Sequence, residues 1–173
     1  MTDYDIGLYG LAVMGQNLAL NVADSGFSIA VYNRTESTTR EFAENKIGDK
    51  VIKATYDIET FVQQLKKPRV ILLIVKAGGA VDAVIDALKP YLDAEDIIID
   101  GGNSHYRDTE RRTKALSEAN IRYLGMGVSG GEEGARLGPS LMPGGSYSAY
   151  EQVEPILKAV AAEAGGEPCV AYL

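Results

Sequence analysis

The chain has 173 residues, 46% of them apolar and 24% charged, which is enough for one globular domain with a hydrophobic core. A formal net charge of −7 argues against general binding to nucleic acid or to anionic membranes, and no apolar run approaches the roughly 20 residues of a membrane span. The acidic N-terminus and the single cysteine, Cys169, argue against secretion and predict a cytoplasmic protein without an intrachain disulfide.

Short apolar runs alternate with helical patterns along nearly the whole chain. The runs at 71–75 and 97–99 are apolar without interruption, which is typical of strands buried on both faces of a parallel sheet. Strands are therefore expected at 4–9, 28–32, 51–54, 69–75, 97–100, 121–126 and, at the end of the chain, 168–172.

The stretches between these strands have helical patterns. Asp57 is a suitable N-cap, Asn120 a suitable stop, and Pro155 predicts a break or bend in the last helix. Strands that alternate with helices predict an α/β fold, a Rossmann-type doubly wound, mostly parallel sheet with helices on both faces. The helices are expected at 15–25, 38–45, 58–65, 80–88, 108–119 and 147–164.

A glycine-rich turn follows the first predicted strand and precedes the first helix. It reads Gly10-Leu11-Ala12-Val13-Met14-Gly15, a variant of Gly-x-Gly-x-x-Gly with alanine in second place. Gly10 would permit the tight turn and Gly15 the close packing of helix on strand, while free N–H groups of the helix would hold a pyrophosphate. The alternative is a tight turn that binds no ligand.

The end of the second strand carries the signal for the choice of dinucleotide. Enzymes that use NAD place an acidic residue there for the ribose hydroxyls, whereas this chain has Asn33-Arg34-Thr35. Arginine can bind a 2′-phosphate that a carboxylate would repel, so NADP is favoured over NAD. A solvated turn remains an alternative, and Glu36 lies near enough to leave open a methyltransferase that binds S-adenosylmethionine.

Five blocks of sequence, spread in order over essentially the whole chain, resemble one family. Besides Gly10 to Leu18 and Asn33-Arg34-Thr35, they are Asp-Gly-Gly-Asn-Ser at 100–104, Gly-Val-Ser-Gly-Gly-Glu-Glu-Gly-Ala at 127–135 and Pro-Ser-Leu-Met-Pro-Gly-Gly at 139–145. Together they resemble 6-phosphogluconate dehydrogenase. The wider β-hydroxyacid dehydrogenase group, including the hydroxyisobutyrate type, shares a similar turn and a Ser-Gly-Gly segment, and it stays open as an alternative.

The resemblance implies an enzyme of the pentose phosphate pathway and of gluconate utilization. The family oxidises the C3 hydroxyl of 6-phosphogluconate with NADP. The resulting β-keto acid loses carbon dioxide to give ribulose 5-phosphate, and no metal takes part. The family's lysine base, glutamate acid, large C-terminal helical domain and homodimer interface correspond to sequence beyond these residues. We therefore expect residues 1–173 to be an NADP-binding Rossmann-like domain with no catalytic residue of its own.

The resemblance also assigns contacts residue by residue. Val75, Lys76, Ala77 and Ala80 match a segment that passes the pyrophosphate and nicotinamide, and Asn103 matches an asparagine that contacts both nicotinamide ribose and substrate. Ser129, Gly130 and Gly131 match a loop that holds the carboxylate and hydroxyl end of the substrate. These positions join Gly10, Leu11, Ala12, Val13, Met14, Gly15, Asn33, Arg34 and Thr35 as candidate site residues.

Three further residues have an expected position, and one further class of protein is an alternative. Glu132 is a weaker candidate for a nicotinamide contact, the only histidine, His105, is expected on a surface loop, and Cys169 is expected to be a small core residue. A stand-alone nucleotide-binding module without catalysis is the alternative from another class. The final strand-like run at 169–173 favours a domain cut from a longer enzyme.

Overall fold

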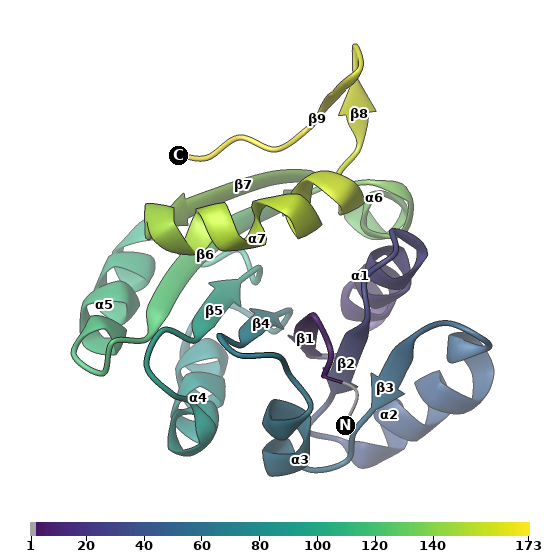
Figure 1. The fold of residues 1–173 in the computed structure, drawn as a ribbon, viewed down its shortest axis with the longest axis horizontal. Coiled ribbons are helices and arrows are strands. Elements are labelled where there is room, and N and C mark those ends of the chain that lie inside the picture. Colours follow the sequence, from purple (N-terminus) through teal and green to yellow (C-terminus); the bar gives the residue numbers. More distant parts are fainter. Residues whose placement is uncertain (1–2) are drawn as a thin grey trace.

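A seven-stranded sheet in the order β3-β2-β1-β4-β5-β6-β7 runs through residues 3–173, the part of the chain that the computed structural model describes (Figure 1). The first six strands are parallel, and only β7 is antiparallel, to β6. The sheet strands are β1 (Ile6–Tyr9), β2 (Ile29–Tyr32), β3 (Ile52–Ala54), β4 (Val70–Leu73), β5 (Ile97–Asp100), β6 (Arg122–Ser129) and β7 (Ser140–Gly145). A separate two-stranded hairpin, β8 (Glu163–Ala164) and β9 (Glu167–Pro168), projects away from the body in Figure 1.

The helices connect successive strands. The α-helices are α1 (Val13–Asp24), α2 (Glu36–Phe42), α3 (Ile58–Gln63), α4 (Gly79–Leu88), α5 (Tyr106–Ser117), α6 (Gly131–Leu137) and α7 (Tyr147–Val160). A π-helical turn, Ala43–Ile47, extends α2, and a 3-10 turn, Lys89–Tyr91, ends α4. None of the helices in residues 3–173 combines the length and the apolar character needed to cross a membrane.

The sheet is buried on both faces because neighbouring strand residues point to opposite sides. Leu8 packs in a cluster with residues of α1 and α7, whereas the adjacent Tyr9 packs with residues of α3, α4 and α5. The same alternation separates Leu124 from Tyr123 in β6. This two-sided core confirms the expected fold, a doubly wound, mostly parallel sheet with helices on both faces.

Several local expectations agree with the structure. Asp57 caps α3 by accepting a hydrogen bond from the Thr60 N–H at 2.7 Å. Asn120 follows α5 with a left-handed φ of 54°, a conformation that asparagine tolerates better than most residues. The phosphate-turn helix begins two residues earlier than expected, at Val13.

Of the break or bend expected at Pro155, the break is wrong, because α7 runs through the proline. The helix ends at Val160 instead of 164. The apolar residues Val153, Ile156, Leu157 and Val160 are buried against the sheet. Packing of this face favours an uninterrupted helix despite the missing proline N–H.

The expected strand at 168–172 was wrong for most of its length. Only Glu167–Pro168 forms a strand, and residues 169–173 run irregularly along the edge of β7. Leu141 N–H donates to the Cys169 carbonyl at 2.9 Å, and Ala171 N–H donates to the Leu141 carbonyl at 3.0 Å. The pairing continues to Leu173, whose N–H donates to the Pro143 carbonyl at 2.9 Å, but Pro143 has no N–H to donate back, so the ladder of hydrogen bonds is incomplete.

Residues 131–145 hold a helix and a strand, α6 and β7, that were not expected. Both are short and rich in glycine, and β7 contains Pro143, so neither shows a clear periodicity. As an edge strand, β7 can accept a proline that a central strand could not.

Candidate active-site cleft

A cleft of about 850 Å³ opens at the carboxyl ends of the parallel strands. It lies where the strand order reverses around β1, between β2 on one side and β4 on the other, the usual ligand position in open α/β sheets. Its wall is formed by Tyr9, Gly10, Ala12, Met14, Tyr32, Asn33, Arg34, Thr35, Ile58, Ile74, Val75, Lys76, Ala80, Ala83, Val84, Ala87, Gly101, Gly102, Asn103 and Val128.

The glycine turn between β1 and α1 has the geometry that its sequence predicts. Gly10 has a φ of 110°, which side chains of L-residues rarely permit. A Cβ added to Gly15 would lie 1.8 Å from the Gly10 carbonyl oxygen, so only glycine lets the helix approach the strand this closely. Ala12 is the N-cap of α1, and among residues 3–173 no side chain caps this helix terminus. Its first N–H groups therefore remain available at the cleft.

Asn33 joins the end of β2 to this turn. Its Oδ1 accepts a hydrogen bond from the Leu11 N–H at 3.0 Å, and its Nδ2 donates to the Thr35 carbonyl at 3.2 Å. Arg34 and Thr35 are exposed beside it on the cleft wall. The amide of Asn33 thus fixes the shape of the turn, while the guanidinium of Arg34 is free to face a ligand.

The charge of the cleft is opposite to that of the whole chain. Among the described residues, the wall carries the cations Arg34 and Lys76 and no carboxylate, although the net charge of the chain is −7. Burial raises the pKa of Tyr9 and of Tyr32 on the same wall, so both phenols stay protonated at neutral pH. The cleft can therefore attract an anion that the rest of the surface repels.

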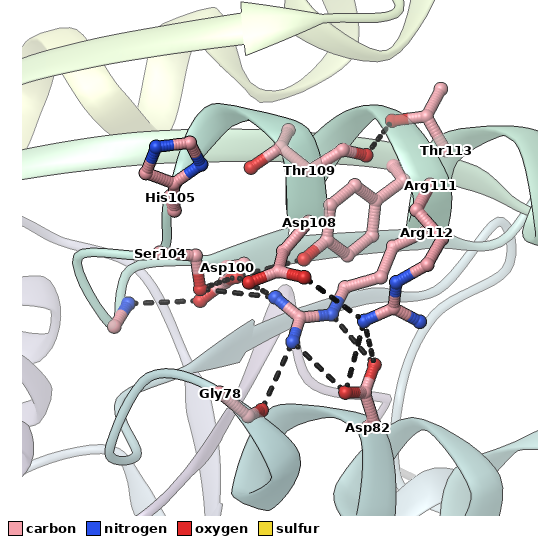
Figure 2. Close-up of polar contacts among 12 residues, drawn as sticks. Gly78, Asp82, Asp100, Ser104, His105, Asp108, Thr109, Arg111, Arg112 and Thr113 are labelled. Carbon is pink, nitrogen blue, oxygen red and sulfur yellow. Dashed lines mark hydrogen bonds and ion pairs between the residues drawn. The ribbon is translucent and has the colours of Figure 1, made fainter.

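A second loop at the cleft follows β5. Asn103 lies at its tip, exposed and with a left-handed φ of 60°. The carboxylate of Asp100 beneath it accepts hydrogen bonds from the Gly102 N–H at 2.9 Å and from the Ser104 hydroxyl at 2.6 Å (Figure 2). The loop is thereby folded back over Asp100 on both sides of Asn103.

The cleft brings together most of the residues expected at the site, but not all of them. Leu11 and Gly15 are buried beneath the turn, and Val13 and Ala77 do not lie on the wall. The wall ends at Val128, so Ser129, Gly130 and Gly131 lie just beyond it, where exposed residues lead into α6.

The structure also shows the positions of His105, Glu132 and Cys169. His105 is exposed and caps α5, its Nδ1 accepting from the Arg107 N–H at 3.3 Å. The Glu132 carbonyl accepts from the Asn17 side chain at 3.0 Å, which joins α6 to α1. Cys169 is only half-buried, so it is not the core residue that was expected.

The sequence reasoning missed the polar residues under the β5 loop, namely Asp82, Asp100, Ser104, Arg112 and Tyr123. One feature of the sequence indicated a buried polar network. Arg112 stands four residues before the buried Leu116, so an arginine occupies the buried face of α5. An arginine at such a position needs buried partners.

The sheet order and the glycine turn at its switch point define a Rossmann-type domain of the dinucleotide-binding class. A family model described as the NAD binding domain of 6-phosphogluconate dehydrogenase matches residues 5–173. The chain therefore belongs to the 6-phosphogluconate dehydrogenase family, as its sequence blocks indicated.

Individual relatives agree with this assignment. The chain is 56% identical over 173 residues to the NADP(+)-dependent, decarboxylating 6-phosphogluconate dehydrogenase of Bacillus subtilis, covering 100% of this chain and 37% of that protein. A solved structure of Plasmodium falciparum 6-phosphogluconate dehydrogenase, described with its cofactor NADP+ and with its substrate 6-phosphogluconate, matches at 50% identity with a TM-score of 0.92 and covers 97% of this chain and 36% of that chain. The chain thus spans little more than a third of the length of these relatives.

A more distant enzyme shares the fold alone. Mycobacterium tuberculosis 3-hydroxyisobutyrate dehydrogenase matches with a TM-score of 0.81 at 18% identity, over 98% of this chain and 54% of that one.

Proposed function

We propose that this chain is the NADP-binding domain of a decarboxylating 6-phosphogluconate dehydrogenase. The observation that carries the proposal is the cleft itself. It has two cations, no carboxylate among the described wall residues, and a helix N-terminus without a side-chain cap beside a glycine turn. These features suit a dinucleotide phosphate in a protein that is otherwise acidic. The Bacillus subtilis relative is named as NADP(+)-dependent, which supports the same choice.

The cofactor is expected to lie across the sheet. Its pyrophosphate would face Gly10, Ala12 and the first turn of α1, which begins at the exposed Val13, with Leu11 and Gly15 shaping the turn from beneath. The 2′-phosphate would bind Arg34, with Asn33 and Thr35 beside it. From β2 to β5 the sheet order spans three strand spacings, roughly 14 Å, so Arg34 and Asn103 mark opposite ends of an extended ligand.

The nicotinamide end would then lie near the wall residues Met14, Val75, Lys76, Ala80 and Asn103, with Ala77 next to Lys76 in the chain. We place 6-phosphogluconate next to it, against Asn103 and the Ser129-Gly130-Gly131 segment. The exposed backbone of these glycines offers N–H donors to a carboxylate. The Plasmodium falciparum enzyme, whose structure is described in complex with 6-phosphogluconate, supports this choice of substrate.

In the intact protein NADP supplies the oxidising power, and residues 1–173 bind and orient both ligands. The lysine and glutamate that move protons in this family, and the homodimer interface, would come from outside these residues. The cytoplasm and the pentose phosphate pathway are the setting that we propose for the reaction.

The intact protein should form NADPH and carbon dioxide in equal amounts from 6-phosphogluconate, and far less NADH when NAD replaces NADP. Faster turnover of 3-hydroxyisobutyrate would support the alternative group instead. A purified fragment of residues 1–173 should bind NADP without turnover. Steady NADPH formation by that fragment would show that it contains a catalytic pair.

A further inference from the structure

A buried polar network lies beneath the β5 loop and does not belong to the wall of the cleft. Its centre is the fully buried carboxylate of Asp100, the last residue of β5. Besides the Gly102 N–H and the Ser104 hydroxyl, this carboxylate accepts hydrogen bonds from the Tyr123 hydroxyl at 2.8 Å and from Arg112 Nη1 at 3.3 Å. Because its donors come from the loop, from β6 and from α5, Asp100 joins three elements.

Arg112 extends the network to a second loop of the cleft (Figure 2). Its Nη2 donates to the Gly78 carbonyl at 3.0 Å, and its Nε donates to Asp82 Oδ1 at 2.8 Å. Gly78 is the N-cap of α4 and follows the Lys76 segment, and Asp82 lies in the first turn of the same helix. One guanidinium therefore ties the loop before α4 to the loop after β5.

The pKa values of Arg112 and Tyr123 are both raised. The hydrogen bond to Asp82 raises the pKa of Arg112, which keeps the guanidinium charged at any working pH. Burial and the neighbouring Asp100 carboxylate raise the pKa of Tyr123, so its hydroxyl remains a donor. Both groups therefore act as hydrogen-bond donors at neutral pH.

Stability alone does not explain a buried ion pair at this place, since well-packed apolar residues often serve stability as well or better. Its geometry points to a definite loop conformation instead. The two loop donors of Asp100 flank Asn103, which has a left-handed φ of 60°, so the hydrogen bonds hold the backbone on both sides of this residue.

We propose that Arg112, acting through Asp100 and Gly78, is a positioning residue that sets the nicotinamide end of the cleft. It contacts neither cofactor nor substrate. It holds Asn103 and the Lys76 segment at a fixed separation, so that both can engage the reacting end of NADP and the substrate. This inference rests on the proposed function.

The chain offers a matched pair of arginines for the test. Arg112→Lys keeps the charge but loses the planar fork that reaches Asp82, Asp100 and Gly78 together. Arg111→Lys is the control, because Arg111 pairs with the same Asp82 at 3.0 Å but is 55% exposed and has no bond to the two loops. Ser104→Ala is a milder variant that removes only one hydroxyl from the network.

The experiment separates the two ends of the cofactor in the intact protein. One titration uses adenosine 2′,5′-bisphosphate, the half of NADP that would bind at Arg34, and kinetics with NADP and 6-phosphogluconate report on the other end. We expect Arg112→Lys and Ser104→Ala to keep the wild-type affinity for the bisphosphate. We also expect their kcat/KM to fall about ten- to a hundred-fold, because a shift of about 1 Å in a group that positions the substrate can cost up to about a hundred-fold. Arg111→Lys should change neither quantity.

Hydrogen exchange without ligand gives a readout independent of activity. The Gly102 amide should exchange faster in Arg112→Lys and in Ser104→Ala than in Arg111→Lys. Equal losses of affinity for the bisphosphate and of kcat/KM would show a general structural role and overturn the proposal. Wild-type kcat/KM in Ser104→Ala, with slow Gly102 exchange, would also overturn it, even if Arg112→Lys fails to fold. A wild-type protein that binds neither NADP nor the bisphosphate would instead refute the proposed function on which this inference depends.

Discussion

Two loops border the same cleft and differ in whether buried charges hold them. The turn at 10–15 takes its shape from its own glycines, through the φ of 110° at Gly10 and the missing Cβ at Gly15. The loop at 101–104 also needs its glycines, but the buried charges of Asp100 and Arg112 hold it in addition. Both loops should therefore fail when atoms are added, because a Cβ on Gly102 would lie 2.4 Å from the Val75 carbonyl oxygen. Only the second should also fail when charge is removed.

The largest effect on stability is expected from Asp100→Asn. The substitution keeps the shape of the side chain but leaves the buried Arg112 with only Asp82 as a charged partner. Breaking a buried ion pair in this way costs about 3 kcal/mol of unfolding free energy, measured by urea denaturation. Asp108→Asn is the matched control, because the 40% exposed Asp108 pairs only with Arg111 and should change stability by less than about 0.5 kcal/mol. Equal effects of the two substitutions would remove the distinction between the loops.

Gly15→Ala tests the glycine turn by adding one carbon. Because the new Cβ would lie 1.8 Å from the Gly10 carbonyl oxygen, the backbone must move, at a cost of about 2 kcal/mol. Binding of NADP should be lost with the shape of the turn. At Gly79, which opens α4 with no atom within 4 Å of an added Cβ, alanine should leave stability unchanged or slightly higher. If Gly15→Ala unfolds at the wild-type urea midpoint and still binds NADP, close packing is not what the turn requires.

Asn33→Ala sharpens the comparison, since this turn also depends on one side chain from elsewhere. Loss of the hydrogen bond from Leu11 N–H should loosen the turn, with an effect of about 1 kcal/mol, or roughly five-fold in affinity. The turn serves the pyrophosphate, which NADP and NAD share, so calorimetry should show the same loss for both. A loss confined to NADP would mean that Asn33 acts at the 2′-phosphate.

The smallest expected effect concerns pH and Asp82. The hydrogen bond from Arg112 lowers the pKa of Asp82 below its ordinary value of 3.8. The pair therefore contributes stability above that value, and the contribution is lost as the pH falls through the lower pKa of the folded state. Because Asp82 is 35% exposed, the difference between wild type and Asp82→Asn should be under about 1 kcal/mol at pH 6 and smaller at pH 3. Urea denaturation at the two pH values measures it, and a difference that grows at pH 3 would contradict this assignment.

The two loops also differ in how far the sequence predicted them. The turn at 10–15 was predictable because its steric requirements fall on residues close together in the chain, where they form a recognisable motif. The strands of the sheet core were predictable because their apolar runs are continuous. The network was not predictable, since Asp82, Asp100, Arg112 and Tyr123 lie on four elements that only the fold brings together. Helix α6 and strand β7 were missed for another reason. Glycine and proline conceal their periodicity, and pairing with β6 decides the structure of β7.

The central claim, that the cleft is built for NADP, is tested most directly by titrating residues 1–173 with NADP and NAD, as wild type and as Arg34→Ala. We expect the wild type to prefer NADP. Arg34→Ala should lose about ten- to a hundred-fold in affinity for NADP and little for NAD, because a hydrogen bond to a charged group is worth about 1.5–3 kcal/mol. Higher salt should reduce the preference, since an exposed arginine–phosphate pair is screened. Equal wild-type affinities for the two cofactors, or equal losses on removing the guanidinium, would contradict the claim.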